Sequence, residues 1–178
     1  VVVRPEVALR VNSGFPFGYD DGAIWAGRGV TASAQGGVVA RHGPLAVTFA
    51  PIVAWAQNTR FRLRPNGQTG ARQYADGVYP CCIDRPQRYG DRPYAFVDWG
   101  QTTLEVVKWG VATGVSSAND YWGPSADFPV ILGNNAGGFP HVFAGTAAPV
   151  DLWIAKVHGR ALFGRLTQTD YSPTSGEA

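Results

Sequence analysis

The feature that most constrains the fold of this chain is a two-residue alternation of apolar and polar side chains in long extended runs. In residues 30–41 the even positions are Val, Ala or Gly, and the odd positions include Thr, Ser, Gln and Arg. In residues 45–55 the odd positions are mostly large and apolar, and the even positions are mostly Ala or Thr. This period is produced by β-strands, whose successive side chains point to opposite faces. A helical period is hard to find anywhere, so we predict an all-β chain.

The alternating runs predict about seven antiparallel strands in a single domain. The domain is expected to cover residues 1–178, with turns supplied by 23 glycines and 13 prolines. The strands are expected near residues 3–12, 28–41, 45–57, 94–100, 102–117, 138–147 and 149–168. The chain opens directly on a strand without an initiator Met and stops without a domain-closing element. We therefore expect an internal piece of a longer precursor.

Strand length and loop length favour a membrane β-barrel. A water-soluble sandwich or solenoid needs the same alternation, but these runs are longer than the about five or six residues usual in globular sheets. Outer-membrane barrels alternate short periplasmic turns with long outer loops. The expected connections are long at 13–27, 58–93 and 117–137, and short at 42–44, near 100–101 and at 147–149. We predict an antiparallel β-barrel in the bacterial outer membrane, incomplete in this chain and in contact with outer-membrane lipid.

The sequence gives little support for catalysis, metal binding or a cofactor. The three histidines, at positions 42, 141 and 158, have no Ser or Cys neighbour in a recognisable nucleophile setting. The Cys81-Cys82 pair lacks the spacing of a zinc site, and Asp20-Asp21 is interpreted as a solvated turn. A net charge of +2 gives no case for nucleic acid. The chain is therefore predicted not to be an enzyme, and to have no metal, no cofactor and no nucleic-acid partner.

Alternating arginines are compatible with recognition of an acidic polymer. Arg60, Arg62 and Arg64 would share one side of an extended backbone, and Arg85 follows in the same long connection. Guanidinium groups pair in a forked geometry with carboxylates and phosphates. Aromatic residues accompany them, and aromatic faces beside polar side chains suit sugar rings. A lumen wall or contact with lipid phosphates would produce the same arginine pattern, and both interpretations stay open.

Several motifs, taken in order, resemble the Wzi family of capsule assembly proteins. They lie in four segments: "VNSGFPFGYDDGAIWAGRGV" (11–30), "IDRPQRYGDRPY" (83–94), "NDYWGPSADFPVILGNNAGGFPH" (119–141) and "APVDLWIAKVHGRALFGRL" (148–166). The resemblance covers most of the chain, which is much shorter than a full family member. It implies an outer-membrane β-barrel lectin that holds capsular polysaccharide at the cell surface, and not an enzyme. A porin-like channel for small solutes is the alternative function.

The resemblance and the arginine pattern together define a predicted polysaccharide-binding set. The residues are Trp25, Arg28, Arg60, Arg62, Arg64, Arg85, Trp122, Asn134 and Asn135. The 122–140 loop is expected to cap the barrel mouth, with its Pro and Gly residues fixing the backbone and its Asn amides offering paired donors and acceptors. A loop that merely closes the barrel end is the alternative.

Overall fold

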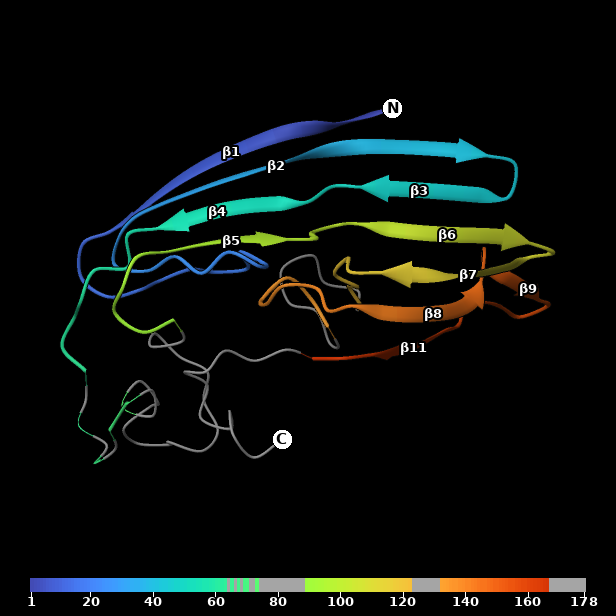
Figure 1. Ribbon diagram of the computed structural model, residues 1–178. Helices are drawn as coiled ribbons and strands as arrows, with labels where there is room; N and C mark the ends of the chain where they lie inside the picture. Colours follow the sequence, from blue (N-terminus) through green and yellow to red (C-terminus); the bar gives the residue numbers. More distant parts are fainter. Residues whose placement is uncertain are drawn as a thin grey trace.

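The chain forms an antiparallel sheet, seen in a computed structural model that describes residues 1–63, 65, 67, 69, 70, 73, 89–122 and 132–166 (Figure 1). Its strands are β1 (Val2–Asn12), β2 (Gly29–His42), β3 (Leu45–Phe49), β4 (Ile52–Ala56), β5 (Tyr94–Asp98), β6 (Thr103–Lys108), β7 (Val111–Ser116), β8 (His141–Thr146) and β11 (Arg160–Gly164). Two short strands, β9 (Val150–Leu152) and β10 (Ala155–Val157), form a separate hairpin. Every pairing between strands is antiparallel, so the predicted all-β, antiparallel class is confirmed. Among the described residues there is no helix with the length and apolar character to span a membrane.

Strands β3 and β4 are two halves of one strand that runs beside β2. Residues 38–42 of β2 pair with β3, and residues 31–35 pair with β4. The interruption falls at Ala50-Pro51, because proline has no N–H to give to the ladder. The Ala50 N–H instead donates to Thr102 Oγ1 at 3.2 Å. The side-chain faces predicted for the strand 45–57 are confirmed, but the strand is interrupted in its middle.

The next strand is broken at the same level, between β5 and β6. β5 pairs with β4 and β6 pairs with β3, and both run in the same direction (Figure 1). Gly100 lies in the break with a φ of +56°, so close to β4 that a Cβ there would stand 2.3 Å from the Ala50 carbonyl oxygen. The short turn predicted near 100–101 is therefore wrong, because the chain continues along the same neighbouring strand.

The turn that reverses the chain lies instead at Trp109-Gly110, inside the predicted strand 102–117. Both residues have positive φ, +52° and +77°, as a type I′ hairpin turn requires. Lys108 pairs with Val111 across it. Because Lys108 pairs with Val111, an even position with an odd one, Thr103 and Glu105 point to the opposite face of the sheet from Val111, Thr113 and Val115.

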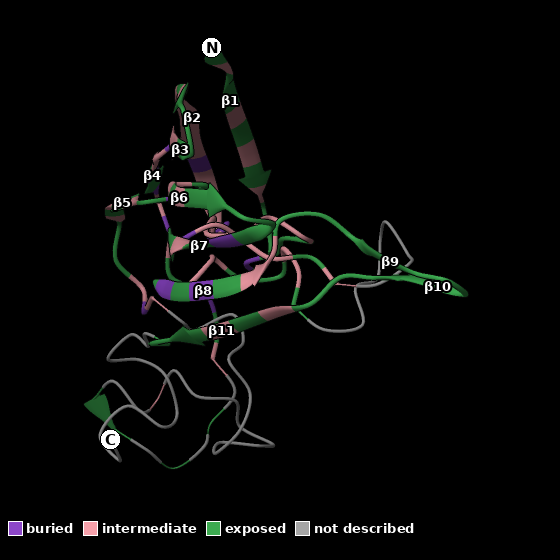
Figure 2. Cartoon of the chain, turned by 90° about the vertical axis from the view of Figure 1, so that its right-hand side faces the viewer, coloured by how far each residue is buried: buried purple, intermediate pink, exposed green. Residues whose placement is uncertain are grey.

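The predicted strand 149–168 is also divided. Residues 147–159 leave the sheet as an excursion that carries the β9–β10 hairpin, and the sheet resumes at β11. The short turn predicted at 147–149 is therefore wrong. The hairpin turns at Trp153-Ile154, with Leu152 opposite Ala155. Figure 2 shows it projecting away from the sheet, on the concave side.

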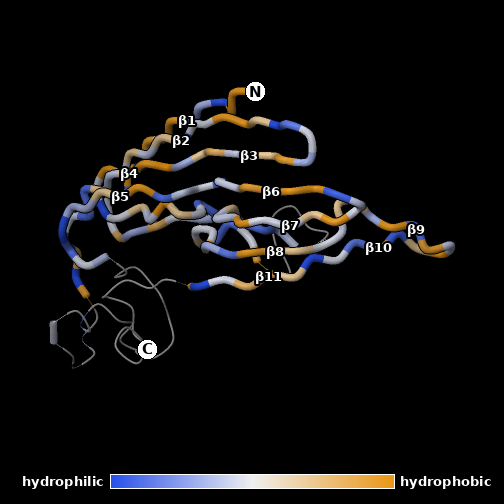
Figure 3. Tube along the Cα trace, turned by 45° about the vertical axis from the view of Figure 1, so that its right-hand side comes forward, coloured by the Kyte–Doolittle hydropathy of each residue, from blue (hydrophilic) through white to orange (hydrophobic). Residues whose placement is uncertain are grey.

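The sheet curves into an open trough with β1 and β11 at its two outer edges, and among the described residues β5 is paired on one side only (Figures 1 and 2). The convex face carries large apolar side chains that are exposed, such as Val97 at 75% and Phe163 at 83%. The same face includes Val7, Leu9, Val11, Val38, Leu45, Phe49, Val53, Trp55, Trp99, Leu104, Val106, Val111, Val115 and Val142. Figure 3 shows hydrophobic residues in strands throughout the sheet, including β4 and β6. The concave face carries polar residues, including Glu6, Arg10, Ser33, Gln35, Asp98, Thr103, Glu105, Ser116, His141 and Arg160. The two faces predicted for residues 30–41 and 45–55 match this division.

The buried core of the described residues is small. Its apolar members are Ala26, Ala50, Ala54, Ala56, Phe61, Ala112 and Phe143. Only the two phenylalanines are large, so most of the large apolar surface faces outward rather than into a core. Connection 13–28 and the described parts of connection 117–140, residues 117–122 and 132–140, pack against the concave face instead, and their contact with it creates the candidate site.

Candidate functional site

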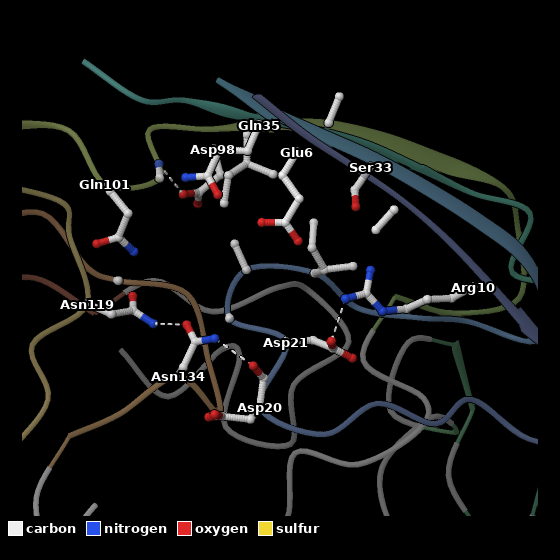
Figure 4. Close-up of a pocket in the computed structure, with 18 residues that line it drawn as sticks. Glu6, Arg10, Asp20, Asp21, Ser33, Gln35, Asp98, Gln101, Asn119 and Asn134 are labelled. Atoms are coloured by element: carbon white, nitrogen blue, oxygen red, sulfur yellow. Dashed lines mark hydrogen bonds and ion pairs between the residues drawn. The ribbon is translucent and has the colours of Figure 1, made fainter. Parts of the chain in front are cut away.

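A cavity of about 240 Å³ lies between the concave face of the sheet and the two long connections 13–28 and 117–140 (Figure 4). Strands β1, β2 and β5 contribute Glu6, Arg10, Ser33, Gln35 and Asp98 from one side. The connections contribute Asp20, Asp21, Asn119 and Asn134 from the other side, and Gln101 lies at the break between β5 and β6. Figure 4 shows Glu6, Ser33 and Arg10 on the sheet side of the space and Asp21, Asn119 and Asn134 on the other, with Arg10 reaching Asp21 across it.

Asn134 joins the two connections. Its Nδ2 donates to the Asp20 carbonyl oxygen, and its Oδ1 accepts a hydrogen bond of 2.7 Å from Asn119 Nδ2. The Gly22 N–H donates to the Asn134 carbonyl oxygen at 2.7 Å. Asp20 has a φ of +55°, in the left-handed region that Asn and Asp tolerate better than most residues. The predicted sugar-binding role of Asn134 therefore competes with a role in fixing the loops, because its side-chain donor and acceptor are already engaged.

The cavity is acidic. Glu6, Asp20, Asp21 and Asp98 supply four carboxylates against the single guanidinium of Arg10, a formal charge of −3. Arg10 Nη2 contacts Asp21 Oδ1 at 2.6 Å, which compensates one carboxylate. This balance was not predicted, since Asp20-Asp21 was interpreted as a solvated turn and Glu6 and Asp98 were not singled out. A signal was present, because Glu6, Ala8 and Arg10 alternate with Val7 and Leu9 in the first strand.

The predicted Trp25 belongs to a column of aromatic rings beside the cavity. Its ring packs against Tyr89 at 6.2 Å, Tyr89 stacks on Tyr94 at 4.5 Å, and Tyr94 stacks on Phe96 at 6.1 Å. The Tyr94 hydroxyl donates to the Trp25 carbonyl oxygen. The Trp25 ring therefore holds the 13–28 connection on the sheet, and part of its stacking surface is already covered.

Asn58 fixes the beginning of the next long connection. It is fully buried and has a φ of +44°. Its Nδ2 donates to the carbonyl oxygens of Gly90 at 2.9 Å and Arg92 at 3.1 Å. One amide therefore closes the 58–93 connection near its base, and the sequence did not reveal this role.

The predicted arginines have different surroundings. Arg28 donates through Nε to the Ser13 carbonyl oxygen at 3.1 Å and through Nη1 to the Arg60 carbonyl oxygen at 2.8 Å, so it ties two connections together. Arg60 is 85% exposed and lies 3.7 Å from Asp91. Arg62 is also exposed, and the buried Phe61 separates the two, as the predicted alternation requires.

Arg60 and Arg62 line a second hollow of about 290 Å³, together with Phe61, Leu63, Gln73 and Asp91. The remaining predicted site residues are not gathered there. Trp122 is half-buried, and Asn135 is exposed and does not line the acidic cavity. Arg64 and Arg85 lie outside the described residues, as do Cys81-Cys82 and residues 123–131 of the predicted cap.

His141 lies in a buried ionic cluster beside the cavity. Its Nδ1 donates to the Phe139 carbonyl oxygen at 2.8 Å when the ring carries its proton there, and its Nε2 lies 3.5 Å from Asp120 Oδ2. Asp120 Oδ1 contacts Arg160 Nη1 at 3.2 Å, and the Arg160 guanidinium stacks on the Phe143 ring at 3.8 Å. The cluster joins the edge strand β11 to β8 and to the 117–140 connection. Within the described part of the chain, no group of three or more His, Cys, Asp or Glu residues could hold a metal ion.

These features define a curved, antiparallel all-β protein with an exposed apolar convex face and a polar cavity on its concave face. Comparison of the chain with protein-family models, with curated proteins and with solved structures gives no match. The resemblance in the sequence motifs and the geometry of the two faces therefore carry the functional argument.

Proposed function

We propose that this chain is part of an outer-membrane β-barrel that binds capsular or another surface polysaccharide and anchors it at the cell surface. The observation that carries the proposal is the distribution of side chains over the sheet. Large apolar side chains are exposed on the convex face, while the polar residues of the concave face meet two loops and a cavity. A soluble protein buries its large apolar side chains, whereas a barrel turns them toward lipid.

The dimensions of the strands support a membrane location. A tilted strand needs about 9–11 residues to cross the hydrocarbon layer. β1 has 11 residues and β2 has 14. The broken strands beside them span residues 45–56 and 94–108, which are also long enough. Trp55 and Trp99 are exposed on the convex face, where aromatic residues of a barrel contact lipid or the headgroup region.

The arrangement of the loops favours an anchor over the porin-like channel. Connections 13–28 and 117–140 lie on the concave face, which would be the lumen wall of a barrel, and Asn134 joins them. A channel needs this space to be open, whereas a binding site gains rigid walls from it. Ion conductance of the protein in a planar lipid bilayer is expected to be small, and a large, steady conductance would favour the channel.

Polysaccharide retention tests the proposed function. Cells that lack the protein should release surface polysaccharide into the medium, because many weak contacts along the polymer are lost together. Cells that express the protein again should retain it. The measurement is the ratio of cell-bound to released polysaccharide, with total polysaccharide as the control for synthesis. An unchanged ratio in cells without the protein contradicts the proposal.

A further inference from the structure

From the polar groups around the acidic cavity we infer that it holds a single sugar unit without a negative charge, and that it excludes uronic acids and other acidic sugars. This inference rests on the proposed function and narrows its ligand. It also distinguishes the acidic cavity from the hollow lined by Arg60 and Arg62, although residues of both were predicted to form one binding set.

Carboxylates supply acceptors on both sides of the cavity, and Ser33 and Gln101 each supply a donor as well as an acceptor. The amide of Gln35 already donates to the Ala50 carbonyl oxygen, and the amides of Asn119 and Asn134 donate within the two connections. Asp98 Oδ1 accepts from the Gly100 N–H at 2.7 Å, which leaves its second oxygen for a ligand. A carboxylate accepts hydrogen bonds and does not donate. The complementary ligand is therefore rich in donors, as the hydroxyl groups of a sugar are.

Arg10 supplies a donor at the edge of the cavity. Its Nη2 is occupied by Asp21, whereas its Nη1 is shielded from solvent and has no hydrogen-bond partner among the described residues. A buried donor without a partner costs about 1–3 kcal/mol. A ligand hydroxyl can accept this bond and also donate to a carboxylate, because a hydroxyl group is both a donor and an acceptor.

The formal charge sets the specificity. With four carboxylates and one guanidinium around the space, a ligand carboxylate would meet a net negative field. Specificity of this kind comes from repulsion of the wrong ligand as much as from attraction of the right one. The volume of about 240 Å³ is smaller than that of most small-molecule pockets, so it accommodates one sugar ring and not an oligosaccharide.

The test compares three methyl glycosides that share one ring: the glucoside, the glucosaminide and the glucuronide. Binding to the purified protein in detergent is measured by ligand-observed NMR at 20 mM and 150 mM NaCl. The glucoside and the glucosaminide should bind. The dissociation constant of the glucuronide should be at least roughly fivefold higher, which corresponds to about 1 kcal/mol of charge repulsion. The difference should be smaller at the higher salt concentration.

Two sets of variants locate the effect. Glu6→Gln combined with Asp98→Asn removes two negative charges while nearly preserving shape, and should reduce the discrimination against the glucuronide by roughly fivefold. Glu6→Gln alone, on an exposed strand position, serves if the double variant folds poorly. Asp151→Asn removes a negative charge from the β9–β10 hairpin, outside the cavity, and should leave the discrimination unchanged.

Equal or tighter binding of the glucuronide to the unmodified protein overturns the inference, as does discrimination that the Glu6 and Asp98 variants leave unaltered. Saturable binding of Ca²⁺ alone, with no effect of any glycoside, would make the cavity a cation site and overturns it as well. If no glycoside binds while cells still retain polysaccharide, the inference fails and the proposed function survives. If no glycoside binds and cells without the protein retain polysaccharide normally, both the inference and the proposed function are contradicted.

Discussion

At the scale of single residues, the predicted sugar-binding set contains two kinds of side chain. Arg28 and Asn134 have their hydrogen-bonding groups engaged inside the protein, and Trp25 packs in an aromatic column. Arg60 and Arg62 are exposed. Residue type alone does not separate these cases, because an amide or guanidinium serves a loop backbone as well as a ligand.

Asn134 and Asn135 provide a matched pair that tests this division. Asn134→Ala removes the bonds to the Asp20 carbonyl oxygen and to Asn119, and should lower the free energy of unfolding by about 1–3 kcal/mol. Asn135→Ala, at the exposed neighbour, should change it by less than about 0.5 kcal/mol. Urea unfolding in detergent measures both. A larger loss for Asn135→Ala would show that Asn134 does not hold the two connections together.

At the scale of elements, alternation of apolar and polar residues predicts where strands lie. Residues with special backbone properties, such as Pro and Gly, determine where the strands break. Pro51 interrupts one strand because it cannot donate to the ladder, and Gly100 allows the neighbouring strand to bend at the same level. Trp109-Gly110 reverses the chain in a left-handed turn. A tryptophan at positive φ is unusual, so the residue type at position 109 does not signal this turn.

The turn can be tested with two glycines that have the same open surroundings. A Cβ at Gly110 or Gly159 would meet no atom within 4 Å, but only Gly110 has a φ in the left-handed region. Gly110→Ala should therefore lower the free energy of unfolding by about 1–2 kcal/mol, from backbone strain alone. Gly159→Ala should leave it nearly unchanged or raise it slightly. Equal effects in the two variants would contradict the turn geometry.

At the scale of the whole molecule, the question is whether the convex face of the sheet contacts lipid or water. Leu104 and Glu105 are neighbours on β6 that point to opposite faces. Leu104→Arg should lower the stability of the membrane-inserted protein by about 2–4 kcal/mol, because it places a charge in the hydrocarbon layer. Glu105→Arg, on the concave face, should be tolerated better.

The measurement for this pair is the fraction of protein recovered in the outer-membrane fraction in folded form, together with urea unfolding in lipid vesicles. In a water-soluble sheet the result would differ, since an exposed Leu104→Arg change would be nearly neutral. A well-recovered Leu104→Arg protein with unchanged stability would therefore contradict the membrane proposal.

The orientation in the membrane follows from the ends of the strands. Connections 13–28, 57–93 and 117–140 are long, whereas the chain reverses at residues 43–44 and 109–110 in two-residue turns at the opposite end (Figure 1). Long loops of outer-membrane barrels face the exterior. An epitope tag inserted at Gly67 should be labelled by antibody on intact cells. Labelling only after permeabilisation, with the protein folded, would reverse the orientation.

The sequence by itself determined the class of the fold, the approximate strands and the side-chain faces. Alternation is a local property of the sequence. In residues 30–41 and 45–55, the polarity of each side chain and of its immediate neighbours indicates the face on which it lies. The exposed positions of Arg60 and Arg62 followed for the same reason. Where the local signal was ambiguous, at Gly100 and at Trp109-Gly110, the predicted turns were misplaced.

Only the tertiary structure decided the strand breaks, the path of the long connections and the acidic cavity. The bond from Asn134 to Asp20 joins residues 114 positions apart, and the Ala50 N–H finds Thr102 across 52 positions. Glu6 and Asp98 meet in the cavity because β1 and β5 belong to the same curved sheet. Such contacts depend on curvature and on the packing of loops, which no periodicity along the chain encodes. The charge of the cavity is therefore a property of the folded molecule, while the faces of its strands are properties of the sequence.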